Sequence, residues 1–312
     1  MNQINTEELI NFLLSKQDTK SIDILEGFKL FQAHNRLYKR AATIDFYVTT
    51  LKMLFAYFDW KNVHTTAQIT KELLNNYIVY RTSNFKVKTV TVNKELKSLY
   101  ALLNFLVKRN YIDGFPKVEF LPEETPKIET VHSEDIKRLL EYAHTLCNQS
   151  ELIIRLLIST GIRTTELTFI TKKCIDLDNN QIYLDHTKTG KPRYIFISDD
   201  YTKNLIIKNM NENKKNNFLL FSSKDGSQLT ANAIRVILKK IKRKLNIEVL
   251  SPHKLRHTYA TNLISHGADI ESVRLLMGHS TYEMTKRYLH LSTSHIKSVN
   301  NQFNILKMSQ TH

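Results

Sequence analysis

The first third of the chain carries apolar residues at the spacing of amphipathic helices. Between residues 21 and 120 they recur every three or four positions, which places them on one face of an α-helix. Two such series are Leu51, Leu54, Phe55 and Phe58, and Leu96, Leu99, Leu103 and Leu106. We therefore predict an all-helical bundle over residues 21–120, preceded by a short extension over residues 1–20.

The helical pattern stops between residues 121 and 130. Pro122 and Pro126 lie in this stretch, which has no regular apolar spacing. The residue before each proline is disfavoured in the helical conformation. We predict that residues 121–130 link two domains.

Beyond the linker, helical and strand patterns follow one another. Helical spacing resumes over residues 133–158, and between Gln181 and Ser198 apolar and polar residues alternate around a Thr189-Gly190 turn. Such alternation on both sides of a turn predicts a β-hairpin. Further helices are predicted over residues 231–245, 255–265 and 270–277.

The last patterned segment contains Ser280 and Glu283 at the spacing of a capping box, so we expect them to open a helix that carries Tyr288. A second domain is thus predicted over residues 131–291, mainly α-helical with a small β-sheet or hairpin. Residues 292–312 form a tail with apolar residues at helical spacing. This tail can dock on a neighbouring copy or fold on its own domain.

The charge balance indicates which kind of partner the protein binds. Lys and Arg number 45 against 30 Asp and Glu, a net charge of +15, and such an excess favours a polyanionic partner, above all nucleic acid. From Lys214 to Arg256, eleven basic residues accompany two acidic ones. The candidate DNA-contacting side chains here are Lys239, Lys240, Lys242 and Arg243. A solvated basic surface without a partner is the alternative.

Cysteine usage and hydropathy indicate the cellular compartment of the protein. Cys147 and Cys174 are the two cysteines, and they suggest neither a disulfide framework nor a cysteine-zinc site. Residues 1–20 lack the basic and apolar regions of a signal peptide, and the apolar run 152–158 is interrupted by Arg155. That run is also too short to span a bilayer. We expect a cytoplasmic protein without a membrane partner.

Four short segments of the second half carry candidate chemistry, beginning with the turn after an apolar helix. Arg163 follows Gly161 there, and Glu166 lies three residues on. The turn can aim the guanidinium inward, with Glu166 holding it by a charge-assisted hydrogen bond. A surface ion pair is the alternative.

The tip of the predicted hairpin forms the second segment. It contains Lys188, Lys191 and Arg193, a compact cationic loop that can reach into a DNA groove. A lysine in this loop can also protonate a leaving oxygen if burial lowers its pKa. A solvated polar turn is the alternative.

The third segment opens a helix with His253, Arg256 and His257. His253 and Arg256 are three residues apart, so both can reach one phosphate. A structural histidine is one alternative. A metal site on His253 and His257 is another, but the carboxylate of the HExxH motif is absent and we predict no metal.

The fourth segment contains Gly278, His279 and two tyrosines, Tyr282 and Tyr288. A tyrosine is usually a buried structural residue with a paired hydroxyl. Residue type alone does not distinguish Tyr282 from Tyr288 as a nucleophile.

In their order and separation, these four segments resemble the tyrosine recombinase (phage integrase) family. Its TGxRxxE motif matches residues 160–166, its HxLRH motif matches residues 253–257, and its GH pair matches residues 278–279. The family's nucleophile lies nine residues beyond that histidine, which selects Tyr288 over Tyr282. The resemblance covers about residues 130–291. The first domain matches only in its helical architecture.

The resemblance implies a DNA strand-exchange enzyme that needs no metal, ATP or other cofactor. Tyr288 would attack the scissile phosphate of duplex DNA and form a 3′-phosphotyrosine. The phosphate would be stabilised by Arg163, Arg256 and His279.

In this scheme, residues of the third segment and of the hairpin would transfer the protons. His253 would accept the proton of Tyr288, and Lys188 would protonate the leaving 5′-oxygen. Lys191 is the neighbouring candidate for the second role. Glu166 and His257 would support the groups that contact the phosphate.

The resemblance also implies how the enzyme would engage its partners. Two domains would form a C-shaped clamp around double-stranded DNA, and exchange between two DNA sites implies a homotetramer. Accessory DNA-bending proteins are compatible with this scheme. A type IB topoisomerase-like nicking-closing enzyme is the alternative with the same residue types, and a non-enzymatic DNA-binding protein is a second alternative.

Overall fold

The structure is a computed structural model that describes residues 20–124, 127–185, 192–197, 199–213, 216–222 and 225–288. The chain divides into two compact units, Met1–Thr125 and Pro126–His312. The division falls inside the stretch 121–130. Each unit is described by itself.

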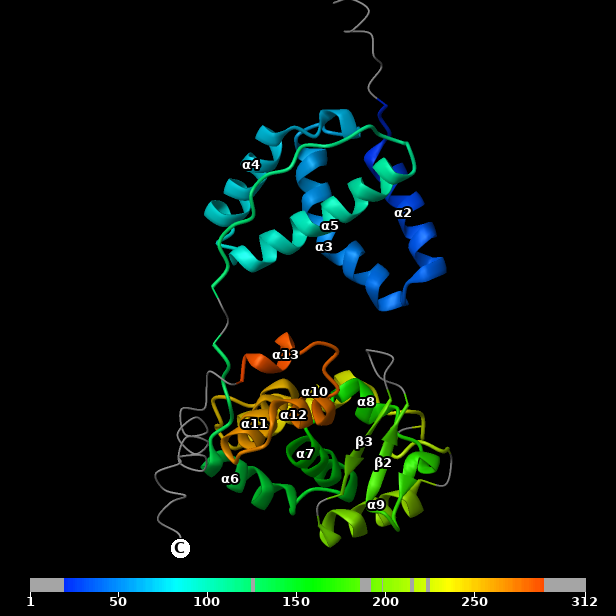
Figure 1. The fold of residues 1–312 in the computed structure, drawn as a ribbon, viewed down its shortest axis with the longest axis vertical. Coiled ribbons are helices and arrows are strands. Elements are labelled where there is room, and N and C mark those ends of the chain that lie inside the picture. Colours follow the sequence, from blue (N-terminus) through cyan, green and yellow to red (C-terminus); the bar gives the residue numbers. More distant parts are fainter. Residues whose placement is uncertain are drawn as a thin grey trace, which may run out of the picture. The chain divides into compact units, whose positions relative to one another are not determined.

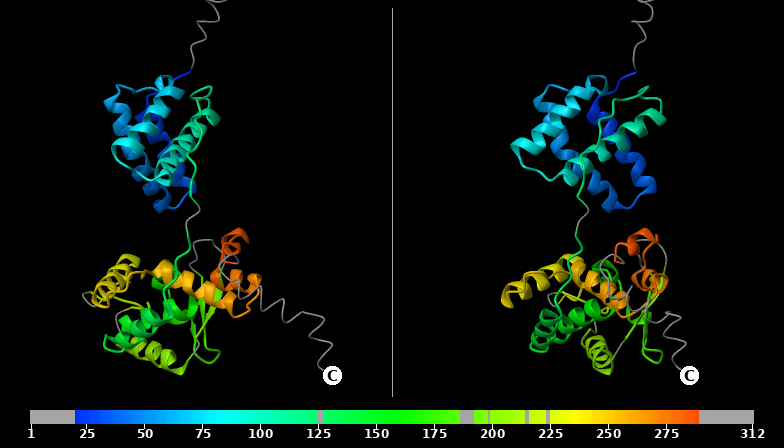
Figure 2. Two further views of the ribbon diagram at one scale, coloured as in Figure 1. Left: turned by 90° about the vertical axis from the view of Figure 1, so that its left-hand side faces the viewer. Right: turned by 60° about the vertical axis from the view of Figure 1, so that its left-hand side comes forward.

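The described part of the first unit is helical (Figure 1). Its elements are α2 (Ile24–Tyr38), α3 (Ala41–Trp60), the 3-10 helix η1 (Thr66–Gln68), α4 (Lys71–Val79), the π-helix η2 (Tyr80–Asn84) and α5 (Thr89–Lys108). Figure 2 shows these helices, coloured blue to teal, packed together from two further sides. The predicted helical bundle is confirmed.

Side chains fix both the ends and the packing of these helices. Asp23 accepts a hydrogen bond from the Glu26 backbone N–H at 2.9 Å and so caps α2. The apolar series of α5 (Leu96, Leu99, Leu103 and Leu106) is buried against α2 and α3. Buried Glu95 pairs with Arg81 and accepts a hydrogen bond from the Tyr77 hydroxyl at 2.8 Å. The unit therefore has its own apolar core with a satisfied buried ion pair.

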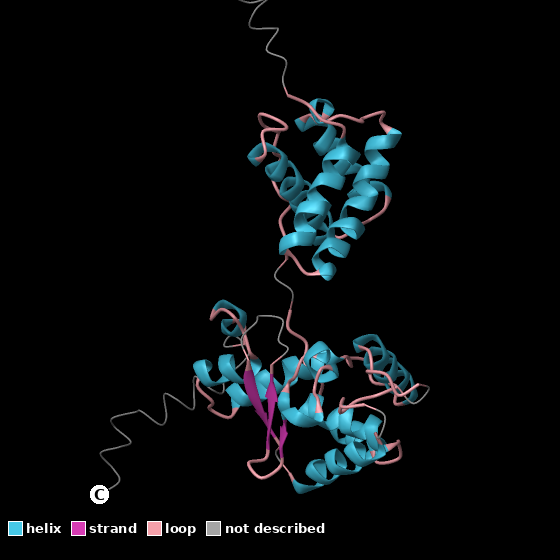
Figure 3. Ribbon diagram, turned by 90° about the vertical axis from the view of Figure 1, so that its right-hand side faces the viewer, coloured by secondary structure: helices cyan, strands magenta, loops and turns pink. Residues whose placement is uncertain are grey.

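The second unit is mainly helical with one small sheet, as predicted (Figure 3). Its helices are α6 (Ser133–Ala143), α7 (Asn148–Thr160), α8 (Thr164–Thr168), η3 (Lys172–Cys174), α9 (Asp200–Glu212), α10 (Ala231–Lys244), α11 (Pro252–Ser265), α12 (Ile270–Met277) and α13 (Glu283–Lys286). Its strands are β1 (Ile175–Asp176), β2 (Gln181–Leu184) and β3 (Arg193–Phe196).

The core of this unit surrounds α7, which contacts α6, α9 and α11. The apolar side chains of residues 152–154 and of residues 156–157 are fully buried. The strands form an antiparallel sheet in the order β1-β2-β3, with Ile182 opposite Ile195. Because side chains alternate between the faces of a strand, Ile182 and Ile195 both reach the core. β1 was not expected from the sequence.

The structure corrects the predicted helix around Tyr288. α13 ends at Lys286, and its N-cap Tyr282 makes no side-chain capping bond. Tyr288 lies two residues beyond the helix, in a turn where its backbone N–H donates to the Thr285 carbonyl at 3.0 Å. The predicted capping box of Ser280 and Glu283 is therefore wrong.

Some expectations fall on residues that the structure does not describe. The hairpin tip with Lys188 and Lys191, most of the N-terminal extension and the tail 292–312 lie outside the described residues. Among the described residues, no helix combines the length and the apolar character needed to cross a bilayer.

Candidate active site

Arg163 occupies the turn that follows α7. Gly161 ends this helix with a φ of 58°, a left-handed conformation that glycine adopts without strain. The Glu166 carboxylate accepts hydrogen bonds from the Arg163 backbone N–H at 3.1 Å and from Nη1 at 2.8 Å. Because the Glu166 side chain is only 1% exposed, this is a buried pair and not a surface ion pair. It fixes the guanidinium in one orientation.

Arg256 is buried on α11. Its guanidinium donates hydrogen bonds to the backbone oxygens of Gly161 and Met277, at the ends of α7 and α12. Carbonyl groups at helix C-termini carry partial negative charge and stabilise a cation there. Burial lowers the pKa of Arg256 to about 9, with the nearby Arg163 adding repulsion. The guanidinium therefore remains charged at neutral pH.

Tyr288 is 2% exposed and lies between two histidines. Its hydroxyl oxygen is 2.7 Å from Nδ1 of His257, and its ring is parallel to that of His279. Burial raises the pKa of Tyr288, although the charge of Arg256 acts in the opposite direction. Tyr282, in contrast, is 46% exposed. The structure thus brings Tyr288, and not Tyr282, to the buried arginine and histidines.

His253 and His257 lie one turn apart on α11, with ring centroids separated by 4.3 Å. Burial, with His253 adding repulsion, lowers the pKa of His257 to about 4. Its neutral ring can accept the Tyr288 hydroxyl proton at Nδ1 when Nε2 carries the ring hydrogen. From the sequence, His253 was expected to accept this proton. The structure places the ring of His257, and not that of His253, at the Tyr288 hydroxyl, because Tyr288 meets the buried side of α11.

His279 follows the left-handed Gly278 that ends α12. It is buried, and its Nδ1 lies 2.8 Å from the Thr285 hydroxyl oxygen. Burial, together with the charge of Arg256, lowers the pKa of His279 to about 3. The ring is neutral at physiological pH, and Thr285 fixes its orientation. Thr285 was not among the residues expected from the sequence.

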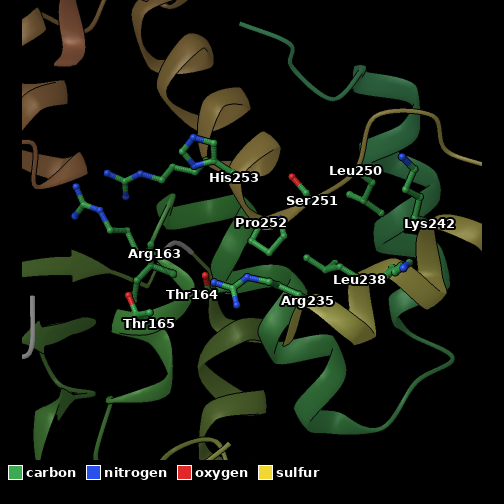
Figure 4. A pocket seen from close by; sticks show the side chains of 13 residues that line it. Arg163, Thr164, Thr165, Arg235, Leu238, Lys242, Leu250, Ser251, Pro252 and His253 are labelled. Atoms are coloured by element: carbon green, nitrogen blue, oxygen red, sulfur yellow. The ribbon is translucent and has the colours of Figure 1, made fainter. Parts of the chain in front are cut away.

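An open pocket of about 680 Å³ lies beside the turn that holds Arg163 and the start of α11. Arg163, His253 and Arg256 are among the residues that line it. Figure 4 shows Arg163 and His253 at one end, Lys242 at the opposite end, and Arg235 between them. The pocket can therefore hold an extended anion against several cationic groups.

Helix α10 divides the predicted DNA-contacting cations between two faces. Arg235, Lys239 and Lys242 line the pocket, while Lys240 and Arg243 are exposed on the helix without lining it. Arg235 was not among the residues expected from the sequence. Its position four residues before Lys239 and seven before Lys242 is the spacing of one helical face, and that spacing is a signal that could have identified it.

Arg193 differs from the expectation that it contacts DNA at the hairpin tip. It begins β3, where it shares the inward side of the strand with buried Ile195. Its side chain is 9% exposed and donates hydrogen bonds to the two Glu166 oxygens at 3.1 and 2.8 Å. Its guanidinium is therefore occupied inside the unit. The alternation of β3 was the sequence signal that this position faces inward.

A sequence model of the phage integrase family matches residues 129–295. Among curated relatives, tyrosine recombinase XerC of Listeria innocua is 32% identical over 222 residues, covering 67% of this chain and 73% of the relative. Tyrosine recombinase XerC of Bacillus subtilis is 30% identical over 222 residues, covering 67% and 72%. Tyrosine recombinase XerD of Rickettsia bellii is 29% identical over 256 residues, covering 73% and 82%.

Solved structures share the fold at lower sequence identity. The Tn1549 transposon integrase in complex with transposon right end DNA has a TM-score of 0.73 and 18% identity, with 91% of this chain and 100% of that chain covered. A lambda integrase dimer bound to a COC′ core site has a TM-score of 0.70 and 14% identity, with 91% and 85% covered.

Proposed function

The chain belongs to the phage integrase family and is a tyrosine-type site-specific DNA recombinase, and we propose that it cuts and rejoins DNA through a covalent link to Tyr288. The observation that carries this proposal is the grouping of Arg163, Arg256, His257 and His279 with Tyr288. Two cations, two neutral proton carriers and a hydroxyl nucleophile are what phosphodiester transfer requires.

The two arginines would bind the nonbridging oxygens of the scissile phosphate. Arg163 and Arg256 both line the pocket, and their fixed charges can stabilise a developing negative charge without a metal ion. The neutral His279 would donate a further hydrogen bond. We propose that the reaction requires no metal.

Tyr288 would attack the phosphorus as its hydroxyl proton passes to a histidine. His257 is the best-placed acceptor, because its Nδ1 is 2.7 Å from the hydroxyl. The new bond joins the Tyr288 oxygen to the 3′-phosphate, and the bond from phosphorus to the 5′-oxygen breaks. Since Tyr288 is 2% exposed, the side chains that cover its hydroxyl would have to open toward the pocket, with His257 still at the hydroxyl, before Tyr288 meets DNA.

The leaving 5′-oxygen would take a proton from Lys188, with Lys191 as the alternative donor. The phosphotyrosine conserves the energy of the broken bond, so rejoining needs no ATP. Attack by a 5′-hydroxyl from a second duplex would produce a recombinant strand.

The cationic stripe of α10 supports a DNA path that leads into the active site. Arg235, Lys239 and Lys242 would contact successive backbone phosphates, while Lys240 and Arg243 are candidates for contacts outside the pocket. Such contacts bind DNA irrespective of its sequence.

An enzyme of this kind would work in the cytoplasm, on double-stranded DNA.

Exchange between two DNA sites would require four protomers, with the tail 292–312 as the candidate connection between neighbours. A type IB topoisomerase-like enzyme would instead act as a monomer. Stable pairing of two DNA sites in solution separates these functions.

The proposal is tested by trapping the protein on nicked duplexes drawn from random DNA, in the presence of EDTA. We expect a covalent adduct that survives SDS and maps to Tyr288. Tyr288→Phe should bind DNA and form no adduct, whereas Tyr282→Phe should form it. An adduct mapped to another residue, or an absolute requirement for a divalent metal, would contradict the proposal.

A further inference from the structure

Three consecutive carbonyl groups at the end of α12 each accept a hydrogen bond from a different arginine. Leu276 accepts from Arg193 Nε at 3.0 Å, Met277 accepts from Arg256, and Gly278 accepts from Arg163 Nη2 at 3.0 Å. These oxygens belong to the last turn of a helix, where carbonyl groups lack partners within the helix. Arg193 thus takes part in the same arrangement as the two proposed phosphate-binding arginines.

Glu166 connects Arg193 to Arg163. Its Oε1 accepts from Arg163 at 2.8 Å and from Arg193 at 3.1 Å, while Oε2 accepts from Arg193 at 2.8 Å. Arg193 is therefore bound to both carboxylate oxygens in a bidentate pair, which is geometrically specific. The carboxylate that orients Arg163 is itself oriented by Arg193.

Because Arg163 and Arg193 share Glu166, the net charge beside the pocket changes. A buried pair of Arg163 and Glu166 alone has no net charge and would attract a phosphate weakly. With Arg193 included, one carboxylate serves two guanidinium groups and the cluster keeps a positive charge. Interactions between such charges are strong where water is excluded.

Arg193 also lies against the residue that precedes His279. A Cβ atom built on Gly278 would be 2.6 Å from Arg193 Nη1, so the guanidinium packs directly on this glycine. Gly278 is the turn that carries the chain from α12 to His279. Arg193 therefore supports the position of His279 from the side of β3.

We propose that Arg193 is a positioning residue of the active site, which offsets the charge of Glu166 and holds Arg163 and His279 in place for phosphate binding. This inference rests on the proposed function. It assigns Arg193 to the chemical step, in contrast to a contact with DNA or a purely structural ion pair.

The three roles predict different behaviour of Arg193→Ala on a nicked duplex that traps the wild-type enzyme. As a positioning residue, its loss should slow adduct formation at saturating DNA by about 10- to 100-fold, the scale on which misplaced catalytic groups act. The dissociation constant for DNA and its salt dependence should stay unchanged. Arg193→Lys should also be slow, because an ammonium group cannot form the bidentate pair.

Arg155→Ala is the matched control. Arg155 pairs at 3.1 Å with Glu151, whose side chain is 4% exposed, so this variant also removes an arginine from a buried carboxylate in the same unit. We expect lower thermal stability and wild-type adduct formation by the folded protein. The double variant Arg193→Ala/Glu166→Gln should react faster than Arg193→Ala, because an uncharged Gln restores the net charge of Arg163.

The pH profile gives a second readout. Burial alone would raise the pKa of Glu166, but bonds from Arg193 and Arg163 lower it below its usual value. The charged groups near Glu166 are Arg163 from the turn, Arg193 from β3 and Arg256 from α11. Removing Arg193 leaves the carboxylate protonated at a higher pH than in the wild type. Acidification should therefore restore part of the adduct formation of Arg193→Ala relative to the wild type, because a protonated Glu166 no longer offsets the charge of Arg163.

Two results with the variants would overturn the role of Arg193 and leave the proposed function unaffected. Normal adduct formation with weaker DNA binding, and a salt slope reduced by about one, would make Arg193 a phosphate contact. Equal losses in Arg193→Ala and Arg155→Ala, with no rescue by Glu166→Gln, would make it structural. If the wild type forms no adduct on any DNA, the proposed function fails and the inference fails with it.

Discussion

The hydroxyl oxygen of Tyr288 lies 2.7 Å from Nδ1 of His257, and both side chains are buried. This contact joins the turn after α13 to the inner side of α11. It places a ring that is uncharged at neutral pH beside the proposed nucleophile, since burial lowers the pKa of His257 to about 4. His253, one turn away, lines the open pocket.

The two histidines should therefore differ when each is replaced by alanine. His257→Ala should slow adduct formation by about 10²- to 10⁴-fold, the usual contribution of a general base. Raising the pH should restore part of this rate, because ionised Tyr288 no longer needs an acceptor. His253→Ala should show less restoration. Single-turnover cleavage rates across pH check this, and greater restoration in His253→Ala would return the role to His253.

The same buried histidines predict how stability depends on pH. His257 and His279 have folded-state pKa values lowered to about 4 and about 3, below about 6.5 in the unfolded chain. As the pH falls below about 6.5, the unfolded state binds protons that the native state does not bind. Each histidine should then reduce the unfolding free energy by ~1.4 kcal/mol per pH unit, until the pH reaches its folded-state pKa.

Urea unfolding of the wild type and of His279→Gln between pH 7 and pH 4.5 measures this effect. The variant should lose less stability over the range, because one of the two buried histidines is absent. Parallel pH dependences in the two proteins would mean that His279 is protonated in the folded state or remains accessible to water.

The faces of α10 predict which cations control DNA affinity. Arg235→Ala, Lys239→Ala and Lys242→Ala should each weaken DNA binding on all sequences and reduce the slope of log affinity against log salt by about one. Lys240→Ala is the control from the same helix, because Lys240 does not line the pocket, and its effect should be smaller. Titrations at several salt concentrations decide this. Equal slopes for Lys240→Ala and Arg235→Ala would place the DNA on a broader surface of α10.

Lys188 should act as the acid that protonates the leaving oxygen. Lys188→Ala should be slow on normal DNA and largely rescued when sulfur replaces the 5′-bridging oxygen, because a thiolate leaves without a proton. Arg256→Ala should be slow on both substrates. Rescue of Lys191→Ala but not of Lys188→Ala would assign the acid to Lys191.

Local patterns in the sequence determined many of the helices and strands of this protein and the faces that they bury. The helix over residues 270–277 begins and ends where it was expected, because Asp269 caps its start and Gly278 adopts the left-handed conformation at its end. The β-hairpin and the buried face of α5 followed from residue spacing in the same way. Short motifs also indicated Arg163, Arg256, His279 and Tyr288 as candidate site residues, since their spacing is a property of the chain itself.

Only the tertiary structure decided how these residues meet. It placed His257 at the Tyr288 hydroxyl. It also showed that Arg193, expected to contact DNA, donates hydrogen bonds to Glu166 and to the Leu276 carbonyl. Local periodicity reports which face of an element is buried, but it does not report which distant side chain occupies that face. Arg193 and Leu276 are 83 residues apart in the chain, and their contact exists because β3 packs against α12.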